Sequence, residues 1–199
     1  CEIGYDACLL VTPYYNKTTQ RGLVAMFKAI ADVSTKPLIL YNIPSRTGVN
    51  IEPETFKELD GYPHIAAIKE ASGNIAKVVD TAALVGKDLA IYSGNDDQVI
   101  PLLSLGGMGV ISVLSNLMPK ETSQMCHLYF EGKTAEAADL QLKYLPLIHA
   151  LFCEVNPIPV KAAMAALGYG ANCVRLPLVP MEEVHQEKLF QEMKNLNLL

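Results

Sequence analysis

Five short apolar runs recur along the chain, and each ends in polar, glycine or proline residues. They read ACLLVTP (7–13), LILYN (38–42), IAAIKE (65–70), LAIYSG (89–94) and GVISV (109–113). The runs are continuous rather than alternating, which is typical of strands that are covered on both faces, as in a parallel sheet. We therefore predict five parallel strands.

Helical patterns lie between these runs. Apolar residues recur every three or four positions from Leu23 to Val33 and from Ile75 to Val85, which is the spacing of one helix face. A shorter helix is predicted to begin at Glu52-Pro53-Glu54, since proline is tolerated at a helix start. The alternation of strands and helices predicts an α/β fold, either an open doubly wound sheet or a closed (β/α)8 barrel.

The last third of the chain has a different pattern. Helices are predicted at about 120–131, 134–153, 159–168 and 182–197. A parallel sheet followed by a helical tail favours a partial (β/α)8 TIM barrel, with strands 4 to 8 in residues 1–118 and barrel-closing and C-terminal helices in 119–199. Three further βα units of about 30 residues each are then expected before Cys1, and without them one sheet edge is open.

Composition and charge narrow the functional classes. Hydrophobic residues make up 50% of the sequence, and the net charge of -5 is spread over scattered groups. A nucleic-acid surface would show a clustered basic stripe, and no apolar run is long enough to predict a membrane span. The five cysteines are far apart, so we interpret them as small buried apolar residues of a cytoplasmic protein rather than as zinc ligands or disulfides.

Candidate chemistry gathers at the predicted strand ends, where the active sites of (β/α)8 barrels lie. Lys69 ends the third run, Tyr41 lies near the end of the second, and Arg46 follows in a proline-containing turn. The four histidines fall at a strand start or on predicted helices. We therefore expect neither a metal site nor a histidine-based triad.

Lys69 has two interpretations. Its ammonium could reach from the strand end into solvent. In the crowded mouth of a barrel, burial would instead disfavour the charged form, and a neutral amine can attack a ketone or aldehyde to form a Schiff base. Tyr41 could then shuttle protons or be a packed aromatic ring, and Arg46 could grip a carboxylate or form a surface ion pair.

Two weaker motifs have a structural interpretation. The glycines of LGGMGV (105–110) precede a strand and follow a helix, the reverse of the dinucleotide-binding order, so we predict a tight turn. Asp96 and Asp97 lie at a predicted helix start, where acidic residues cap the helix and complement its dipole.

Several blocks together resemble one known family. They are PYYN (13–16), LYNIPSRTG (40–48), IKEASGN (68–74), YSGND (92–96), GVISV (109–113) and NPIPVKAAM (156–164). The sequence closely resembles the dihydrodipicolinate synthase family, within the N-acetylneuraminate lyase superfamily of pyruvate-dependent Schiff-base aldolases, and the resemblance covers the whole chain in order.

This resemblance implies a reaction, namely 4-hydroxy-tetrahydrodipicolinate synthesis by Schiff-base condensation of pyruvate with L-aspartate 4-semialdehyde, without a cofactor, on the diaminopimelate route to lysine. It also implies a homodimer or homotetramer and lysine feedback. The resemblance implies that Lys69 forms the Schiff base, and that Tyr41 transfers protons together with Tyr15, which acts across a dimer interface. It implies that Arg46 binds the substrate carboxylate. It also implies that Gly94 and Ile111 line the pyruvate pocket and that Tyr14 lies near the lysine-inhibitor pocket.

The resemblance leaves alternatives open. The family's N-terminal GTTGE-like loop, with a threonine that completes the tyrosine relay, has no counterpart among these residues. We therefore expect the parent protein to be active and this piece alone to be inactive. The rival interpretations are another pyruvate-dependent aldolase of the superfamily, acting on a sugar acid, and an inactive truncated remnant.

Overall fold

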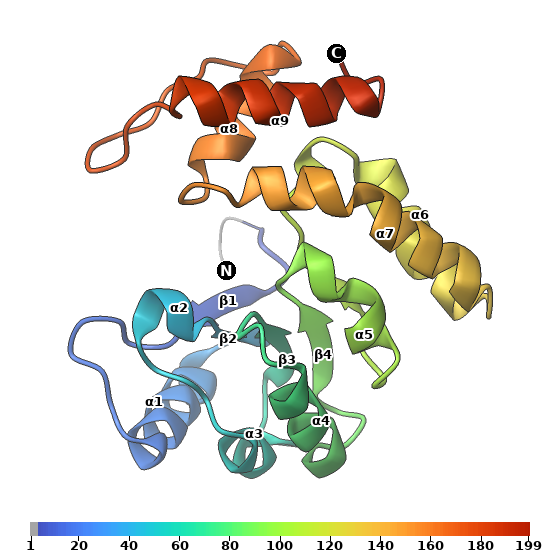
Figure 1. Ribbon diagram of the computed structural model, residues 1–199. Coiled ribbons are helices and arrows are strands. Elements are labelled where there is room, and N and C mark those ends of the chain that lie inside the picture. Colours follow the sequence, from blue (N-terminus) through green and yellow to red (C-terminus); the bar gives the residue numbers. More distant parts are fainter. Residues whose placement is uncertain (1–3) are drawn as a thin grey trace. The chain divides into compact units, whose positions relative to one another are not determined.

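The computed structural model describes residues 4–199, which divide into two compact units, 4–111 and 112–199. The first unit is an α/β assembly (Figure 1). Its elements are β1 (Cys8–Val11), α1 (Gln20–Val33), β2 (Leu38–Asn42), α2 (Pro44–Thr47), α3 (Pro53–Leu59), β3 (Ile65–Glu70), α4 (Ile75–Leu84), β4 (Ala90–Ser93), the 3-10 helix η1 (Asp96–Gln98), α5 (Val99–Leu103) and β5 (Gly109–Val110).

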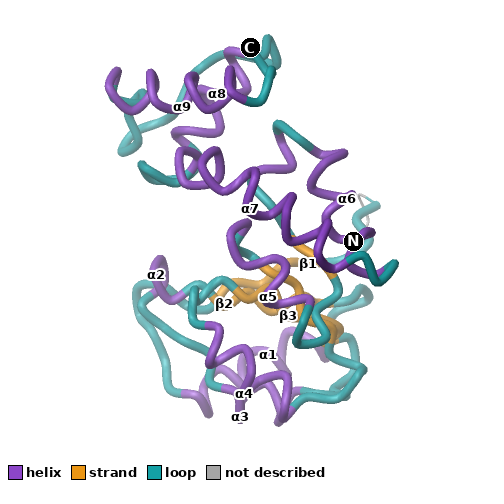
Figure 2. The backbone as a smooth tube through the Cα atoms, turned by 45° about the vertical axis from the view of Figure 1, so that its right-hand side comes forward, coloured by secondary structure: helices purple, strands orange, loops and turns teal. Residues whose placement is uncertain are grey.

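The strands form one parallel sheet in the order β1-β2-β3-β4-β5. Helices α1, α3 and α4 lie on the same side of this sheet (Figures 1 and 2). A doubly wound sheet carries helices on both faces and reverses its strand order at a switch point. Sequential strands with helices on one side are the arrangement of a (β/α)8 barrel wall, which confirms the predicted fold class.

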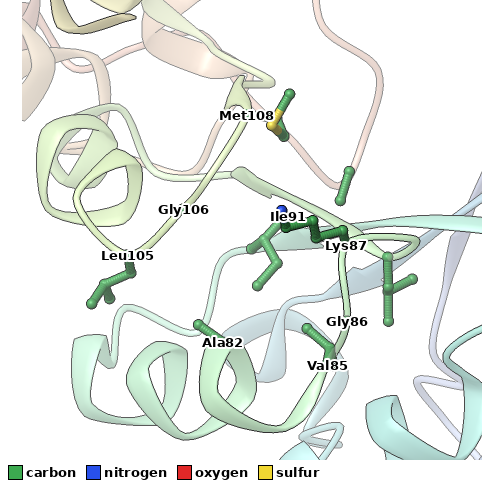
Figure 3. Close-up of a pocket in the computed structure, with 10 residues that line it drawn as sticks. Ala82, Val85, Gly86, Lys87, Ile91, Leu105, Gly106 and Met108 are labelled. Atoms are coloured by element: carbon green, nitrogen blue, oxygen red, sulfur yellow. The ribbon is translucent and has the colours of Figure 1, made fainter. Parts of the chain in front are cut away.

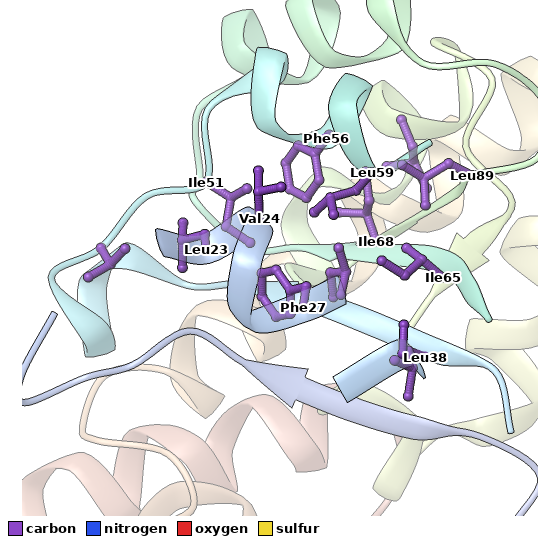
Figure 4. Packing of buried hydrophobic residues seen from close by; sticks show 14 of the residues in the cluster. Leu23, Val24, Phe27, Leu38, Ile51, Phe56, Leu59, Ile65, Ile68 and Leu89 are labelled. Atoms are coloured by element: carbon purple, nitrogen blue, oxygen red, sulfur yellow. The ribbon is translucent and has the colours of Figure 1, made fainter. Parts of the chain in front are cut away.

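The core of the first unit lies between the helices and the sheet. Figure 4 shows Phe27 of α1 and Phe56 of α3 packed near Leu38 and Ile68 of the strands, and all four side chains are at most 1% exposed. The apolar spacing read from the sequence therefore does mark buried faces. Val33 is an exception at 81% exposed, because it is the last residue of α1.

Local sequence explains where the elements begin and end. The Thr19 hydroxyl accepts a hydrogen bond from the Gly22 amide and caps α1, and prolines open α2 and α3. Gly48 ends α2 with a φ of 67°, a conformation in which glycine avoids the steric cost of a side chain. The LGGMGV segment forms the predicted turn between α5 and β5, with Gly106 at a φ of 91°.

The second unit is helical, as the sequence predicts. Its elements are the 3-10 helix η2 (Leu114–Asn116), α6 (Pro119–Phe130), α7 (Thr134–Leu151), α8 (Ile158–Ala166) and α9 (Glu183–Asn195). The boundary between the two units falls within the run predicted as a strand over 109–113, of which only Gly109 and Val110 are in register with β4. The predicted domain boundary between 118 and 119 stays a prediction.

The cysteines depart from their sequence interpretation. Cys1 lies outside the described residues, Cys8 and Cys126 are partly buried, and Cys153 and Cys173 are exposed. The prediction of buried apolar cysteines was therefore wrong for the last two. Both lie in segments outside the helices, after α7 and after α8, where little apolar structure covers a side chain.

No helix among residues 4–199 is both long enough and apolar enough to span a membrane.

Candidate active site

The carboxyl ends of the central strands bring three side chains into one row. Tyr41 of β2 is in register with Lys69 of β3, and Lys69 is in register with Tyr92 of β4. All three are partly exposed, whereas the next residue on each strand is buried. Because successive strand residues point to opposite faces, this row lies on the face opposite α1, α3 and α4.

Lys69 and Tyr41 are in direct contact. The Lys69 Nζ lies 4.3 Å from the centroid of the Tyr41 ring, within the range of a cation–π contact. Burial lowers the pKa of Lys69, and the nearby Asp96 carboxylate partly offsets this by stabilising the ammonium. A lysine with a lowered pKa is neutral, and hence nucleophilic, at a lower pH than an exposed one.

The pKa of the Tyr41 phenol is shifted in the opposite direction to that of Lys69. Burial raises its pKa, and the positive charge of Arg46 acts against this shift. Arg46 lies on the single turn of α2, which begins at Pro44, and it is exposed. The structure therefore brings the amine, the phenol and the guanidinium to one end of the sheet, as the strand positions predicted.

Gly94 leaves the space that the Lys69 side chain occupies. A Cβ atom added at position 94 would lie 2.7 Å from the Ala71 Cβ and 3.1 Å from the Lys69 Cε. Its amide donates a hydrogen bond of 2.7 Å to the Glu70 carbonyl oxygen. Gly94 thus lies against the lysine stem, and a larger residue there would press on the Ala71 Cβ and the Lys69 Cε.

Ile111 follows β5, and its amide donates a hydrogen bond of 2.8 Å to the Ser93 carbonyl oxygen. It lines a hollow of about 330 Å³ on the same face as the row, together with Ile39, Ala67, Tyr92 and Val110. The apolar wall beside Lys69 therefore continues to the end of the sheet.

Tyr14 and Tyr15 lie apart from this group. They follow β1 in a loop and are 71% and 92% exposed. Both side chains are thus mostly exposed within the described residues.

Sequence reasoning underestimated Asp96. The N-cap of η1 is Asn95, and Asp96 follows in the first turn as a residue only 3% exposed. Its charge acts on Lys69. The prediction that Asp96 caps the helix was therefore wrong, while the place of Asp96 and Asp97 in the first turn agrees with the expected acidic helix start. The YSGND block could have signalled this, because it places an acid directly beyond the end of the strand beside Lys69.

A separate hollow of about 450 Å³ lies at the opposite, amino-terminal end of β4 (Figure 3). Ala82, Val85, Leu105 and Met108 are among its lining residues, and the ionisable side chain that lines it is Lys87. This hollow holds neither a carboxylate nor a phenol. The candidate amine, phenol and guanidinium lie instead at the carboxyl ends of the strands.

One group of potential metal ligands occurs within residues 4–199, in the second unit. The Glu154 carboxylate accepts hydrogen bonds from the Glu182 amide at 3.0 Å and from His185 Nδ1 at 2.7 Å. Glu182 is the N-cap of α9. These bonds fasten the start of that helix to the segment before α8, and they account for the grouping without an ion.

Comparison with known proteins identifies the family and agrees with the fold. The sequence profile of the dihydrodipicolinate synthetase family matches residues 1–196. The chain belongs to this family. It is 54% identical to the 4-hydroxy-tetrahydrodipicolinate synthase of Alkaliphilus oremlandii over 198 residues, covering 100% of this chain and 68% of that protein. It is 56% identical to the enzyme of the same name from Caldicellulosiruptor saccharolyticus over 188 residues, covering 94% of this chain and 63% of that protein.

Solved structures of the dihydrodipicolinate synthase family agree with this assignment. The crystal structure from Thermotoga maritima superposes with a TM-score of 0.97 at 42% identity, covering 100% of this chain and 68% of that one. The structure from Cyanidioschyzon merolae with lysine bound has a TM-score of 0.96 at 42% identity, covering 100% of this chain and 67% of that one. The structure from Acinetobacter baumannii with pyruvate also has a TM-score of 0.96, at 41% identity, covering 100% of this chain and 68% of that one. The chain thus spans about two thirds of the length of these relatives.

Proposed function

We propose that this chain carries the Schiff-base lysine of a 4-hydroxy-tetrahydrodipicolinate synthase, which condenses pyruvate with L-aspartate 4-semialdehyde. The observation that supports this proposal most directly is the state of the Lys69 amine. It lies on a central strand of a chain of this family, contacts the Tyr41 ring and has a pKa lowered by burial. Such an amine is suited to attack a keto carbon.

The proposed steps follow from this geometry. The neutral Lys69 amine adds to the keto carbon of pyruvate, and loss of water leaves an imine. Loss of a proton from the pyruvate methyl group gives an enamine, whose carbon attacks the aldehyde of the semialdehyde. The amine of that substrate then displaces Lys69 by transimination, which closes the ring and frees the lysine.

The surrounding residues have distinct proposed roles. Tyr41, in contact with Lys69, relays protons as imine and enamine interconvert. Arg46 binds the carboxylate of the semialdehyde, since its guanidinium is close enough to act on the Tyr41 pKa. Gly94 and Ile111 border the pyruvate pocket.

The exposed tyrosines fit an assembled enzyme. We propose that Tyr15 completes the proton relay in the site of a neighbouring subunit, which agrees with its 92% exposure in the single chain. Tyr14, at 71% exposed, is assigned to a lysine-binding surface in the same assembly. The relative from Cyanidioschyzon merolae was solved with lysine bound, which supports a search for such a site here.

The test of the reaction is reductive trapping. The complete protein is incubated with pyruvate and borohydride, digested and mapped by mass spectrometry. We expect a reduced pyruvate adduct on Lys69, and no adduct in Lys69→Ala. An intact, unmodified Lys69 peptide under conditions of turnover would reject the assignment. Trapping followed by cleavage of sialic acid, without condensation on the semialdehyde, would point to a sugar-acid aldolase instead.

The role of Arg46 is tested by separating the two substrates. Arg46→Ala should lower kcat/KM for the semialdehyde by about 100-fold, since truncating one partner of a hydrogen-bonded charge pair costs about 2–5 kcal/mol. Pyruvate trapping should change much less. Arg21→Ala, at an exposed arginine of α1, is the matched control. Equal losses in trapping and condensation would argue against carboxylate binding.

A further inference from the structure

A row of buried polar residues lies directly behind the reactive row. Asn42, Glu70 and Ser93 are 2%, 6% and 1% exposed. They are adjacent in sequence to Tyr41, Lys69 and Tyr92, and they are in register across β2, β3 and β4. Their side chains therefore point to the helix-covered face, where apolar residues form most of the core.

Each carboxylate oxygen of Glu70 accepts a hydrogen bond. Its Oε2 accepts a bond of 3.0 Å from Asn42 Nδ2, and its Oε1 accepts one of 2.6 Å from the Ser72 amide. The first bond joins β3 to β2, and the second fixes the turn that follows Lys69. The backbone that follows Lys69 is thus tied both to β2 and to its own turn through one carboxylate.

Asn42 extends the same connection to the Arg46 segment. Its Nδ2 also donates to Asn50 Oδ1 at 2.9 Å, and its Oδ1 accepts from the Ile51 amide at 3.0 Å. Residues 50 and 51 close the segment that leaves α2, the turn that carries Arg46. Asn42 therefore ties β2 to β3 and to the end of this turn.

A buried carboxylate is expensive to place in a core. Burying a charge is tolerated when it is paired or hydrogen-bonded. Within residues 4–199, Glu70 is in none of the ion pairs, and its two hydrogen bonds are the amide contacts described above. Apolar residues of similar volume often stabilise a fold as well as or better than buried charges do, so stability alone is a poor reason for a glutamate here.

We propose that Asn42 and Glu70 are a positioning pair, which holds Lys69 against Tyr41 and sets the turn bearing Arg46. The pair touches no substrate and acts through the backbone of the residues that do. This inference rests on the proposed Schiff-base function, because the quantity that the pair controls is the placement of the lysine amine.

The test exploits the donor and acceptor pattern of the pair. In Glu70→Gln one of the two oxygens becomes an amide group, so either the Ser72 amide or the Asn42 Nδ2 faces another donor. In Asn42→Asp the donor to Glu70 is lost and two carboxylates face each other. In the double variant Asn42→Asp/Glu70→Gln, the new Gln amide can donate to the new Asp carboxylate, while the remaining Gln oxygen still accepts from Ser72.

The measured quantity is the rate of borohydride trapping at saturating pyruvate in the complete protein. We expect each single variant to slow trapping by about 10- to 100-fold, the usual effect of losing a partner that orients a reactive group. The double variant should be at least about tenfold faster than the product of the two single effects predicts, because coupled residues are not additive.

The matched control is Thr55→Val on α3. Thr55 is 4% exposed, and its hydroxyl donates 2.7 Å to Gln20 Oε1 in the same polar region. This variant should lower the melting temperature as the single variants do, yet trap pyruvate at the wild-type rate. A merely structural role for Asn42 and Glu70 predicts that they behave like Thr55.

The outcomes separate the two proposals. Wild-type protein that forms no adduct on Lys69 rejects the proposed function. Wild-type trapping together with unchanged rates in folded single variants overturns the positioning pair alone, as does a double variant with no recovery. If a single variant does not fold, Asn42→Ser replaces it, since this change shortens the side chain, breaks the bond to Glu70 and adds no charge. A trapping rate in folded Asn42→Ser equal to that of Thr55→Val likewise overturns the proposal.

Discussion

Gly94→Ala is the substitution whose consequences the structure defines most sharply. The added Cβ would lie 2.7 Å from the Ala71 Cβ, 3.1 Å from the Lys69 Cε and 3.2 Å from the Glu70 carbonyl oxygen. Two of these three atoms, the Ala71 Cβ and the carbonyl oxygen, cannot turn away by a change of side-chain rotamer. Relief must therefore come from movement of β4 relative to β3, the strand that carries Lys69.

The size of the effect can be worked from these distances. Ordinary contact begins at 3.4 Å, so the strands must separate by about 0.7 Å to relieve a contact of 2.7 Å. Overpacking of this kind costs about 1–3 kcal/mol of stability. A misplacement near 1 Å can lower a reaction rate by about 100-fold, so we expect pyruvate trapping to slow by about 10- to 100-fold.

The assay compares trapping rate with melting temperature for two alanine substitutions. Gly107→Ala is the control, because its Cβ would lie 2.8 Å from the Leu102 carbonyl oxygen, in the turn before β5 at the other end of the sheet. Both variants should melt at a lower temperature, but only Gly94→Ala should trap slowly. Wild-type trapping by a folded Gly94→Ala protein would refute the idea that the lysine stem fills this space.

Three further outcomes are expected. Lys69→Met should abolish trapping. It should also raise the free energy of unfolding by about 1 kcal/mol, because burial disfavours the ammonium that it replaces. A denaturant titration that shows a less stable variant would contradict this. Asp96→Asn removes the charge that raises the Lys69 pKa, so the trapping rate should reach half of its maximum at a lower pH, and a shift to higher pH would reverse the inferred sign. Phe56→Ala, at a side chain that is 0% exposed, should cost about 3–5 kcal/mol of stability; a loss below about 1 kcal/mol by calorimetry would mean that this core is loosely packed.

Much of the fold follows from the sequence because its signals are local. Continuous apolar runs such as LILYN and IAAIKE correspond to β2 and β3, since strands of a barrel wall are apolar along most of their length. The position of Lys69 at the end of such a run was visible in the same way. The strand predicted over GVISV was too long, because β5 pairs only as far as Ser93, where β4 ends. The end of β5 is thus set by the neighbouring strand, which the local sequence does not reveal.

The parts that escaped the sequence depend on contacts between distant residues. Asp96 follows a local capping pattern, and only its burial beside β3 relates it to Lys69. The bond between Asn42 and Glu70 joins residues 28 positions apart, so it requires the register of β2 on β3. A slip of β2 by one residue on β3 would turn the Asn42 side chain to the opposite face from Glu70, so the bond depends on how the two strands pack together.

The reactive row and the buried polar row behind it have separate roles for a physical reason. An amine that must lose its proton cannot be held by a strong carboxylate partner, because such a partner would raise its pKa. The Lys69 amine instead rests on the Tyr41 ring at 4.3 Å, a contact that is weaker than a buried ion pair. The order that the side chain lacks must therefore come from its backbone. In a strand the next residue points to the opposite face, so a carboxylate at position 70 can anchor that backbone from the buried side, with its charge directed away from the amine.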